Sequence, residues 1–296
     1  MNKGILYAIG AYLIWAFLPI YWKFLGSVSA SEIVGHRMVW SFAFVFGVLI
    51  VKRDWKRYRT VLRTPKILMI YLVTASLLGI NWLTYVWAIN AGFIVESSLG
   101  YFINPLVNVL LGVIFLRERL RLGQWLPIGL AVIGVLYLTV SYGELPWIAL
   151  TLAFSFGFYG LIKKTAPLNS LDGFALETGF MFLPALVYLY YLKTSGQGVF
   201  TDQGVMITLL LILSGFVTGY PLLLFGAGAR RIRLSTLGLL QYIAPTGQFL
   251  IGVMIYGEDF SQSKLIGYSI VWIALAFYSI EGILNRRRNR LVPSPS

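Results

Sequence analysis

The feature that most constrains this chain is a series of ten long apolar segments separated by short charged connections. Each segment is close to the roughly 20 residues that an α-helix needs to cross the hydrocarbon core of a bilayer. Only 12% of the 296 residues are charged, against about a quarter in a soluble domain. The sequence therefore predicts an all-α integral membrane protein and excludes a soluble globular fold. The ten predicted transmembrane helices lie near residues 4–25, 32–51, 67–90, 95–116, 122–141, 145–162, 174–192, 205–226, 235–256 and 265–284.

The basic residues are concentrated on one side of the predicted membrane. Of the 24 Lys and Arg residues, 20 lie near the N-terminus, in connections that follow even-numbered segments, or in the tail. Cytoplasmic connections of membrane proteins carry such an excess, so both termini are predicted to be cytoplasmic. The net charge of +13 is then a topology signal, and no nucleic-acid partner is expected. Residues 286–296 form a basic tail that we expect to be disordered.

An internal repeat divides the chain into two halves. When the sequence is shifted by 140 residues, seven of 21 positions are identical between 98–118 and 238–258. The same shift pairs Lys23 with Lys163 and Arg37 with Glu177. We expect a first repeat over 1–143 and a second over 144–285. Because five helices is an odd number, the second repeat is inverted, as in transporters that work by alternating access; the alternative is a duplication retained for packing alone.

Two prolines occupy equivalent positions in the two repeats. Pro105 and Pro245 each lie about ten residues into a segment, which is near the midplane of the bilayer at 1.5 Å per helical residue. Interrupted helices at matching positions indicate a binding site, although ordinary packed kinks are the alternative. Amide and phenol groups surround the prolines and would line a central cavity: Tyr101, Asn104, Asn108, Gln241, Tyr242 and Gln248.

Ionisable residues within the segments are the second group of candidates. Glu32 and His36 are four residues apart on one helical face, so they could form a proton site. The alternative is a pair of side chains that snorkel to the interface and orient the helix. Inversion places Arg37 and Glu177 toward opposite membrane faces, so we expect no direct ion pair and assign each to a gate on its own side.

Other features are structural or negative. Aromatic side chains could stack on a planar or cationic solute, although such residues also form interfacial belts. Gly215 and Gly219 have the GxxxG spacing of closely packed membrane helices. With no cysteine and one histidine, we expect no catalytic residue, no metal site and no cofactor. An intramembrane enzyme acting on lipid-like substrates and a non-transporting partner or sensor are remote alternatives.

Several motifs together resemble the RarD-type permeases, which belong to the EamA family of the drug/metabolite transporter superfamily. The motifs are LGYFINPLVNVLLG (99–112), NWLTYVWAIN (81–90), SFGFYGLIKK (155–164), TGYPLLLF (218–225), LGLLQYIAPT (237–246) and YGE (256–258). The resemblance implies ten helices in two inverted EamA repeats and a location in the bacterial inner membrane. It also implies an export role associated with chloramphenicol sensitivity. Members of the superfamily export amino acids and metabolites by exchange with protons, and some act as facilitators.

The expected function is secondary transport of a small amphipathic or aromatic organic solute by alternating access, with proton coupling as a hypothesis. A passive facilitator or an importer is the alternative, and both a monomer and a homodimer remain open. The expected partners are the solute and the lipid bilayer. The candidate solute-binding residues are Asn81, Trp82, Tyr101, Asn104, Pro105, Tyr159, Gln241, Tyr242 and Pro245. The candidate coupling or gating residues are Glu32, His36, Arg37, Lys163 and Glu177.

Overall fold

The chain folds into a bundle of long α-helices. The computed structural model describes residues 2–52, 63–91, 93–142, 146–256 and 262–291, and these ranges contain no β-strand. Helices are the expected solution for apolar segments in lipid, because a helix satisfies its backbone hydrogen bonds within the segment. The helices are α1 (Lys3–Lys23), α2 (Ala30–Lys52), α4 (Pro65–Asn90), α5 (Ile94–Leu116), α6 (Leu122–Tyr142), α7 (Trp147–Thr165), α8 (Ser170–Thr194), α9 (Val205–Ala229), α10 (Leu234–Gln241), α11 (Ile243–Met254) and α12 (Gln262–Leu291).

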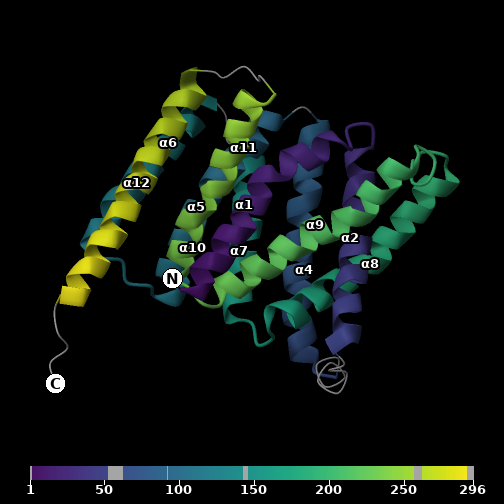
Figure 1. The fold of residues 1–296 in the computed structure, drawn as a ribbon, viewed down its shortest axis with the longest axis horizontal. Coiled ribbons are helices and arrows are strands. Elements are labelled where there is room, and N and C mark those ends of the chain that lie inside the picture. The colour runs from purple at the N-terminus through teal and green to yellow at the C-terminus, as the bar shows by residue number, and fades with distance from the viewer. Residues whose placement is uncertain (1, 53–62, 92, 143–145, 257–261, 292–296) are drawn as a thin grey trace.

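These helices match the ten predicted segments, with α10 and α11 together forming the ninth (Figure 1). Seven helices in the described ranges are long and apolar enough to cross a membrane, namely α1, α2, α4, α5, α6, α8 and α9. A shorter apolar stretch of α12 covers Leu265–Tyr278. The predicted all-α class is confirmed. The predicted repeat boundary at 143 and 144 lies outside the described residues. Of the tail expected to be disordered, 286–291 form the end of α12, and 292–296 lie outside the described residues.

The two prolines do not interrupt their helices in the same way, so the expectation of matched interruptions is wrong. α5 runs continuously through Pro105, whereas the ninth segment divides at Tyr242 and Pro245 becomes the third residue of α11. Proline is tolerated in the first turn of a helix because its missing N–H would have no partner there. Near Pro105, the carbonyl of Phe102 accepts a hydrogen bond from the Tyr242 hydroxyl at 3.1 Å. The two proline regions are thereby joined to each other.

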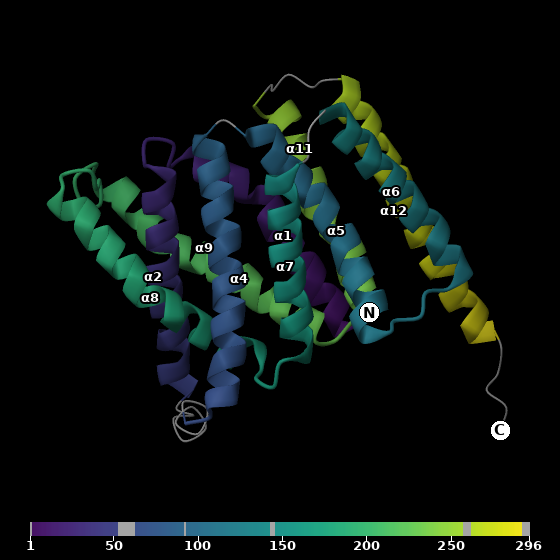
Figure 2. The same cartoon turned by 180° about the vertical axis from the view of Figure 1, so that it is seen from behind.

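The helix packing follows the internal repeat. α1 packs on α9 and α11. Its counterpart in the second half, α7, packs in the same way on α4 and α5, which are the counterparts of α9 and α11. α2 packs on its own counterpart, α8. α5 packs on α10, and α6 packs on α12 to form a pair at one edge of the bundle (Figure 2). The two halves therefore interdigitate, and their helices depend on the other half for burial. This pattern is what two related halves would produce.

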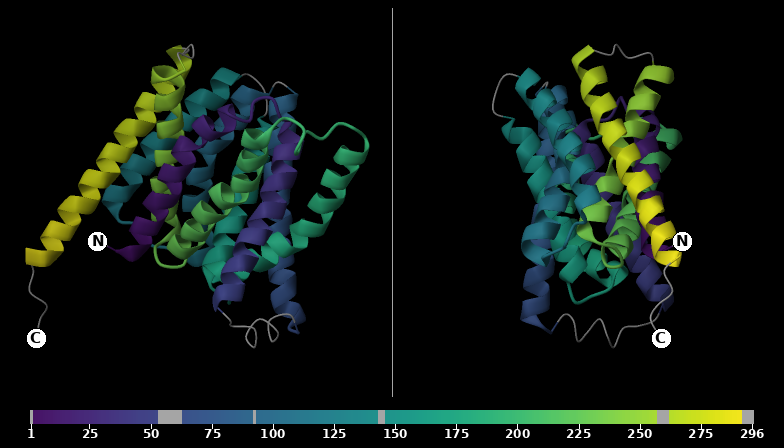
Figure 3. Two further views of the ribbon diagram at one scale, coloured as in Figure 1. Left: turned by 45° about the vertical axis from the view of Figure 1, so that its right-hand side comes forward. Right: turned by 90° about the vertical axis from the view of Figure 1, so that its left-hand side faces the viewer.

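Both ends of the described chain lie at the same end of the bundle. α1 begins and α12 ends there (Figure 3), and we call this the terminal end. α1 ends and α12 begins at the opposite end, which we call the far end.

Small residues let α2 and α9 approach closely. A Cβ atom added at Gly215 would lie 2.2 Å from the carbonyl carbon of Trp40 and 2.5 Å from the backbone nitrogen of Ser41. The Ser41 hydroxyl also donates a hydrogen bond to the Gly215 carbonyl at 3.0 Å. At Gly219 the added atom would meet Phe44 and Phe174 at 3.2 Å. The predicted use of this GxxxG pair for close helix packing is confirmed.

Candidate functional site

A cavity of about 400 Å³ lies between the two halves of the bundle. Its walls come from α1, α2, α4, α5, α7, α9, α10 and α11, and most wall residues lie in the part of each helix nearer the far end. Exposed Lys23, at the end of α1, forms part of the wall, so the cavity reaches the far-end surface. This volume is within the range of small-molecule sites.

Six of the nine predicted solute-binding residues line the cavity: Asn81, Trp82, Tyr101, Asn104, Gln241 and Pro245. The other three do not. Pro105 is buried where α10 crosses α5, so closely that a Cβ at Gly238 would lie 2.5 Å from the Pro105 carbonyl oxygen. Tyr159 and Tyr242 are also buried. The Tyr159 hydroxyl donates a hydrogen bond to Glu177, and the Tyr242 hydroxyl donates one to the Phe102 carbonyl. Their placement in the cavity was wrong because helix rotation turns them into the packed interior.

Amide side chains form the polar part of the wall and tie helices of both halves together. The Asn104 amide donates to the Ala153 carbonyl at 2.7 Å. Behind it, the Asn108 amide donates to the Gln241 side-chain oxygen at 2.9 Å. The Asn81 amide donates to the Leu152 carbonyl at 2.9 Å. These bonds hold the polar groups on α4, α5, α7 and α10 in fixed positions beside the cavity.

Aromatic rings form much of the remaining wall. Trp15 meets Phe156 at 5.8 Å between ring centroids, and Tyr85 meets Tyr101 at 5.9 Å. Trp22 also lines the cavity. A planar or apolar solute body would therefore find large, rigid contact surfaces. Five further wall residues were not among the predicted solute-binding residues: Pro19, Lys23, Phe156, Thr218 and Tyr256.

Two charged residues line the cavity among the described residues, and Arg37 is the one that lies within a helix, away from its ends. Its guanidinium carbon lies close to two indole rings, 5.0 Å from the Trp22 centroid and 4.7 Å from the Trp82 centroid. Its Nε donates to the Thr218 hydroxyl at 2.9 Å. Lys23 lies nearer the far-end surface, with its Nζ 4.2 Å from the Tyr256 ring centroid. The cavity therefore has an immobilised cation within it and a second cation at its mouth.

A buried ion pair lies toward the terminal end, apart from the cavity. Lys163 Nζ is 3.1 Å from Glu177 Oε1, and the two side chains are 3% and 0% exposed. The Thr74 hydroxyl donates to the same carboxylate at 2.7 Å, and the Tyr159 hydroxyl donates at 3.2 Å. The pair joins α7 to α8, while Arg37 lies at the cavity. As expected, Arg37 and Glu177 form no ion pair with each other.

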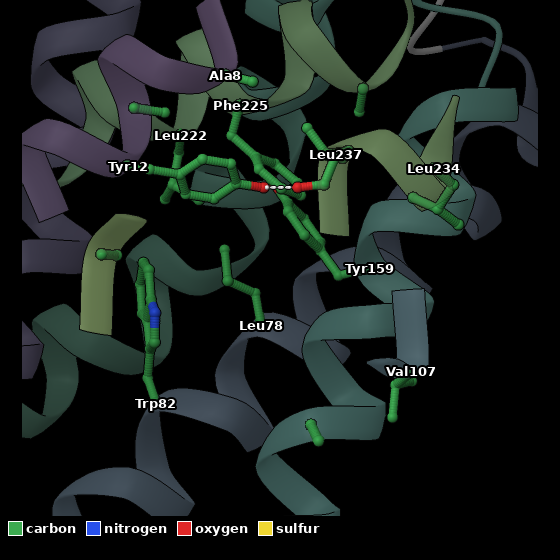
Figure 4. Packing of buried hydrophobic residues seen from close by; sticks show 14 of the residues in the cluster. Ala8, Tyr12, Leu78, Trp82, Val107, Tyr159, Leu222, Phe225, Leu234 and Leu237 are labelled. Atoms are coloured by element: carbon green, nitrogen blue, oxygen red, sulfur yellow. Dashed lines mark hydrogen bonds between the residues drawn. The ribbon is translucent and has the colours of Figure 1, made fainter. Parts of the chain in front are cut away.

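Between the cavity and the terminal end, the bundle is closed by aromatic packing and hydrogen bonds. The Tyr12 hydroxyl donates to the Leu237 carbonyl at 3.0 Å, beside Phe225 and Tyr159 (Figure 4). Near the start of α10, the Glu118 carboxylate accepts the backbone N–H groups of Leu234 and Ser235 at 2.6 and 3.0 Å. These contacts join the two halves at the terminal end.

Glu32 and His36 are buried, at 1% and 4% exposure, and lie outside the cavity wall. Glu32 Oε1 accepts the backbone N–H groups of Val199 and Phe200 at 2.8 and 3.2 Å. It is also 3.9 Å from His36 Nε2. The alternative of a snorkelling pair is therefore wrong, because Glu32 anchors the connection between α8 and α9. No group of three or more metal-ligating side chains occurs among the described residues.

The comparisons agree with this architecture. The model of the EamA-like transporter family matches residues 2–140. "Protein RarD" of Streptomyces exfoliatus is 46% identical over 289 residues, covering 98% of this chain and 92% of the relative. An "Uncharacterized transporter" of Vibrio cholerae serotype O1 is 47% identical, covering 95% and 93%. A solved structure with 17% sequence identity matches with a TM-score of 0.70. The match covers 94% of this chain and 98% of the chain of that structure, which supports the fold.

A multi-span helical bundle with a cavity between its halves, and relatives named as transporters, define a membrane transporter and not an enzyme. The chain belongs to the RarD-type permeases of the EamA-like transporter family.

Proposed function

We propose that this protein is a secondary transporter that exports a small amphipathic or aromatic organic solute by alternating access. The observation that carries the proposal is the cavity between the two halves, which reaches the surface at the far end while the terminal end is closed. A site enclosed by two halves can be exposed to either side when the halves rock against each other. The Lys163–Glu177 pair and the Tyr12–Leu237 contact belong to the gate at the terminal end.

The orientation follows from the charges. The terminal end holds both ends of the described chain, and 20 of the 24 basic residues lie on the side predicted to be cytoplasmic. We place the terminal end in the cytoplasm of a bacterium, with the protein in the inner membrane. The closed terminal end then faces the cytoplasm, and the cavity opens outward. The structure thus corresponds to an outward-facing state of the cycle.

The solute site is tested by substitutions at its wall. The first step is a thermal-shift screen of purified protein against amino acids, amines, nucleosides and antibiotics, because a compound that binds the native state raises its Tm. Tyr101→Ala is expected to weaken the affinity for a stabilising compound about tenfold or more, since it removes an aromatic surface from the wall. Tyr101 is 37% exposed, so the loss of folding stability should be small.

The matched control is Tyr242→Phe. Tyr242 is buried next to the site and does not line the cavity, so its variant should bind with wild-type affinity. Equal affinity of wild type and the Tyr101→Ala and Gln241→Ala variants would contradict the assignment of the cavity as the solute site.

Proton coupling is a second component of the proposal, supported by the burial of Glu32 and His36. Neither Glu32 Oε2 nor His36 Nε2 has a hydrogen-bond partner among the described residues. Solute flux in proteoliposomes is expected to respond to a pH gradient, and Glu32→Gln and His36→Ala should each remove that response. Asp202→Asn, in the exposed pair with Lys193 near the far end, is the control and should retain it. If solute flux through the wild type does not respond to the pH gradient, the result would favour the alternative of a passive facilitator.

A further inference from the structure

The cavity has a marked imbalance of charge. Among the described residues, its wall contains two cations, Lys23 and Arg37, and no Asp or Glu. Six of the 11 acidic side chains are described, and none forms an ion pair with either cation. Glu32 and Glu118 accept backbone N–H groups, Glu177 pairs with Lys163, and the remaining three have their own partners. An ionisable group at membrane depth is costly unless it has a partner or lines a functional path.

The internal repeat shows what this imbalance means. The 140-residue shift aligns Lys23 with Lys163 and Arg37 with Glu177. In the second half, the aligned residues form a closed ion pair at 3.1 Å, so their charges cancel. In the first half, both positions are cationic and both line the cavity. The carboxylate that neutralises the second half has no equivalent in the first half.

Arg37 is also oriented for recognition. Two tryptophan rings lie within 5.0 Å of the guanidinium carbon, and the Thr218 hydroxyl accepts a hydrogen bond from its Nε. Among the described residues, its two terminal nitrogens have no hydrogen-bond acceptor. An arginine in a fixed orientation with free N–H groups is suited to bind a carboxylate with two parallel hydrogen bonds.

We propose that the cavity binds its solute as an organic acid, with the carboxylate held by Arg37 and attracted by Lys23 at the mouth, and the aromatic or apolar body packed against the rings of the wall. This inference rests on the proposed transport function and specifies its substrate class. The solute supplies a negative charge, so its binding offsets one of the two positive charges in the cavity wall. A cationic solute would meet two like charges there, and a neutral one would leave Arg37 without a partner.

The test uses three compounds of similar shape and different charge: indole-3-acetate, indole-3-acetamide and tryptamine. Affinities are measured by calorimetry on the purified full chain in an uncharged detergent. The wild type should bind the acid about tenfold or more tightly than the amide or the amine. Arg37→Gln should remove this preference while the affinity for the amide stays within about threefold. Arg37→Lys, which keeps the charge, should retain part of it.

Lys193→Gln is the matched control, because it removes a positive charge from the same end of the bundle. Lys193 pairs with exposed Asp202 and lies outside the cavity wall, so the variant should retain the preference for the acid. The Tm and the circular dichroism spectrum of Arg37→Gln check independently that this variant is folded. A second arm repeats the titration in nanodiscs with and without phosphatidylglycerol, whose headgroup also carries an anion; equal affinities for the acid are expected.

Three outcomes would overturn the inference, and they differ in what they say about transport. If the amide or amine binds as tightly as the acid and Tyr101→Ala weakens that binding, the organic-acid assignment is wrong and the solute cavity stands. If phosphatidylglycerol in the nanodisc weakens the binding of the acid to the wild type, the cations bind a lipid headgroup. If none of the three compounds binds and no compound of the screen is transported, both the assignment and the proposed function are wrong.

Discussion

Replacement of Glu177 by Gln is expected to lower the free energy of unfolding by about 3–5 kcal/mol, because it leaves the Lys163 ammonium buried without a counter-charge. Lys163 is 3% exposed and its Nζ lies 3.1 Å from Glu177 Oε1. The same carboxylate accepts hydrogen bonds from the Thr74 and Tyr159 hydroxyls, so these partners are disturbed as well. The measurement is reversible unfolding in mixed micelles, followed by circular dichroism.

The double variant Lys163→Met/Glu177→Gln separates charge from shape. Removing both charges avoids the unpaired buried ion, so its stability should be closer to the wild type than that of either single variant. The exposed pair Arg121–Glu281, at 42% and 20% side-chain exposure, supplies the control. Glu281→Gln should cost less than about 1 kcal/mol, because solvent screens such pairs. Equal losses for Glu177→Gln and Glu281→Gln would show that the buried pair has no special importance.

Replacement of Gly215 by Ala is expected to destabilise the protein by about 3 kcal/mol or more, because the new methyl group overlaps the backbone of another helix. Its Cβ would lie 2.2 Å from the Trp40 carbonyl carbon and 2.5 Å from the Ser41 nitrogen. Backbone atoms within a helix cannot move aside as a side-chain end can, so α2 and α9 must separate. The Ser41–Gly215 hydrogen bond is expected to be lost with the close contact.

Gly79→Ala is the matched control for this substitution. Gly79 also lies within a long helix, and the 140-residue shift aligns it with Gly219. An added Cβ at Gly79 meets no atom within 4 Å, so the change in stability should stay within about 1 kcal/mol. Both variants are compared by their Tm in the same detergent. A Gly215→Ala protein as stable as Gly79→Ala would contradict the tight packing of α2 on α9.

The sequence was informative about the cavity where residue chemistry and the repeat agreed. Asn104 and Gln241 line the cavity, as predicted from their positions near the symmetric prolines. Tyr159 and Tyr242, chosen on similar grounds, face the packed interior. A polar or aromatic residue at the correct depth can point in any direction around its helix. Depth follows from the position along the segment, whereas direction depends on how neighbouring helices pack.

The charged residues show the same division. The sequence indicated that Arg37 and Glu177 would be separated, because inversion sends them toward opposite faces, and they are separated. It did not reveal that Glu177 pairs with Lys163, that Glu32 anchors the connection at Val199 and Phe200, or that Lys23 lines the cavity. Each of these contacts joins residues on different helices or connections.

Hydropathy along the chain was sufficient for the all-α class and for the approximate positions of the helices, and the motifs were sufficient for the family. Such properties are local, because a membrane helix satisfies its own backbone within about 20 consecutive residues. The tilt and rotation of the helices were not accessible in this way. They depend on close contacts between helices, such as that of Gly215 on α9 with Trp40 on α2. They also depend on hydrogen bonds between distant segments. Those contacts place Arg37 at the cavity and Glu177 in the closed part of the bundle.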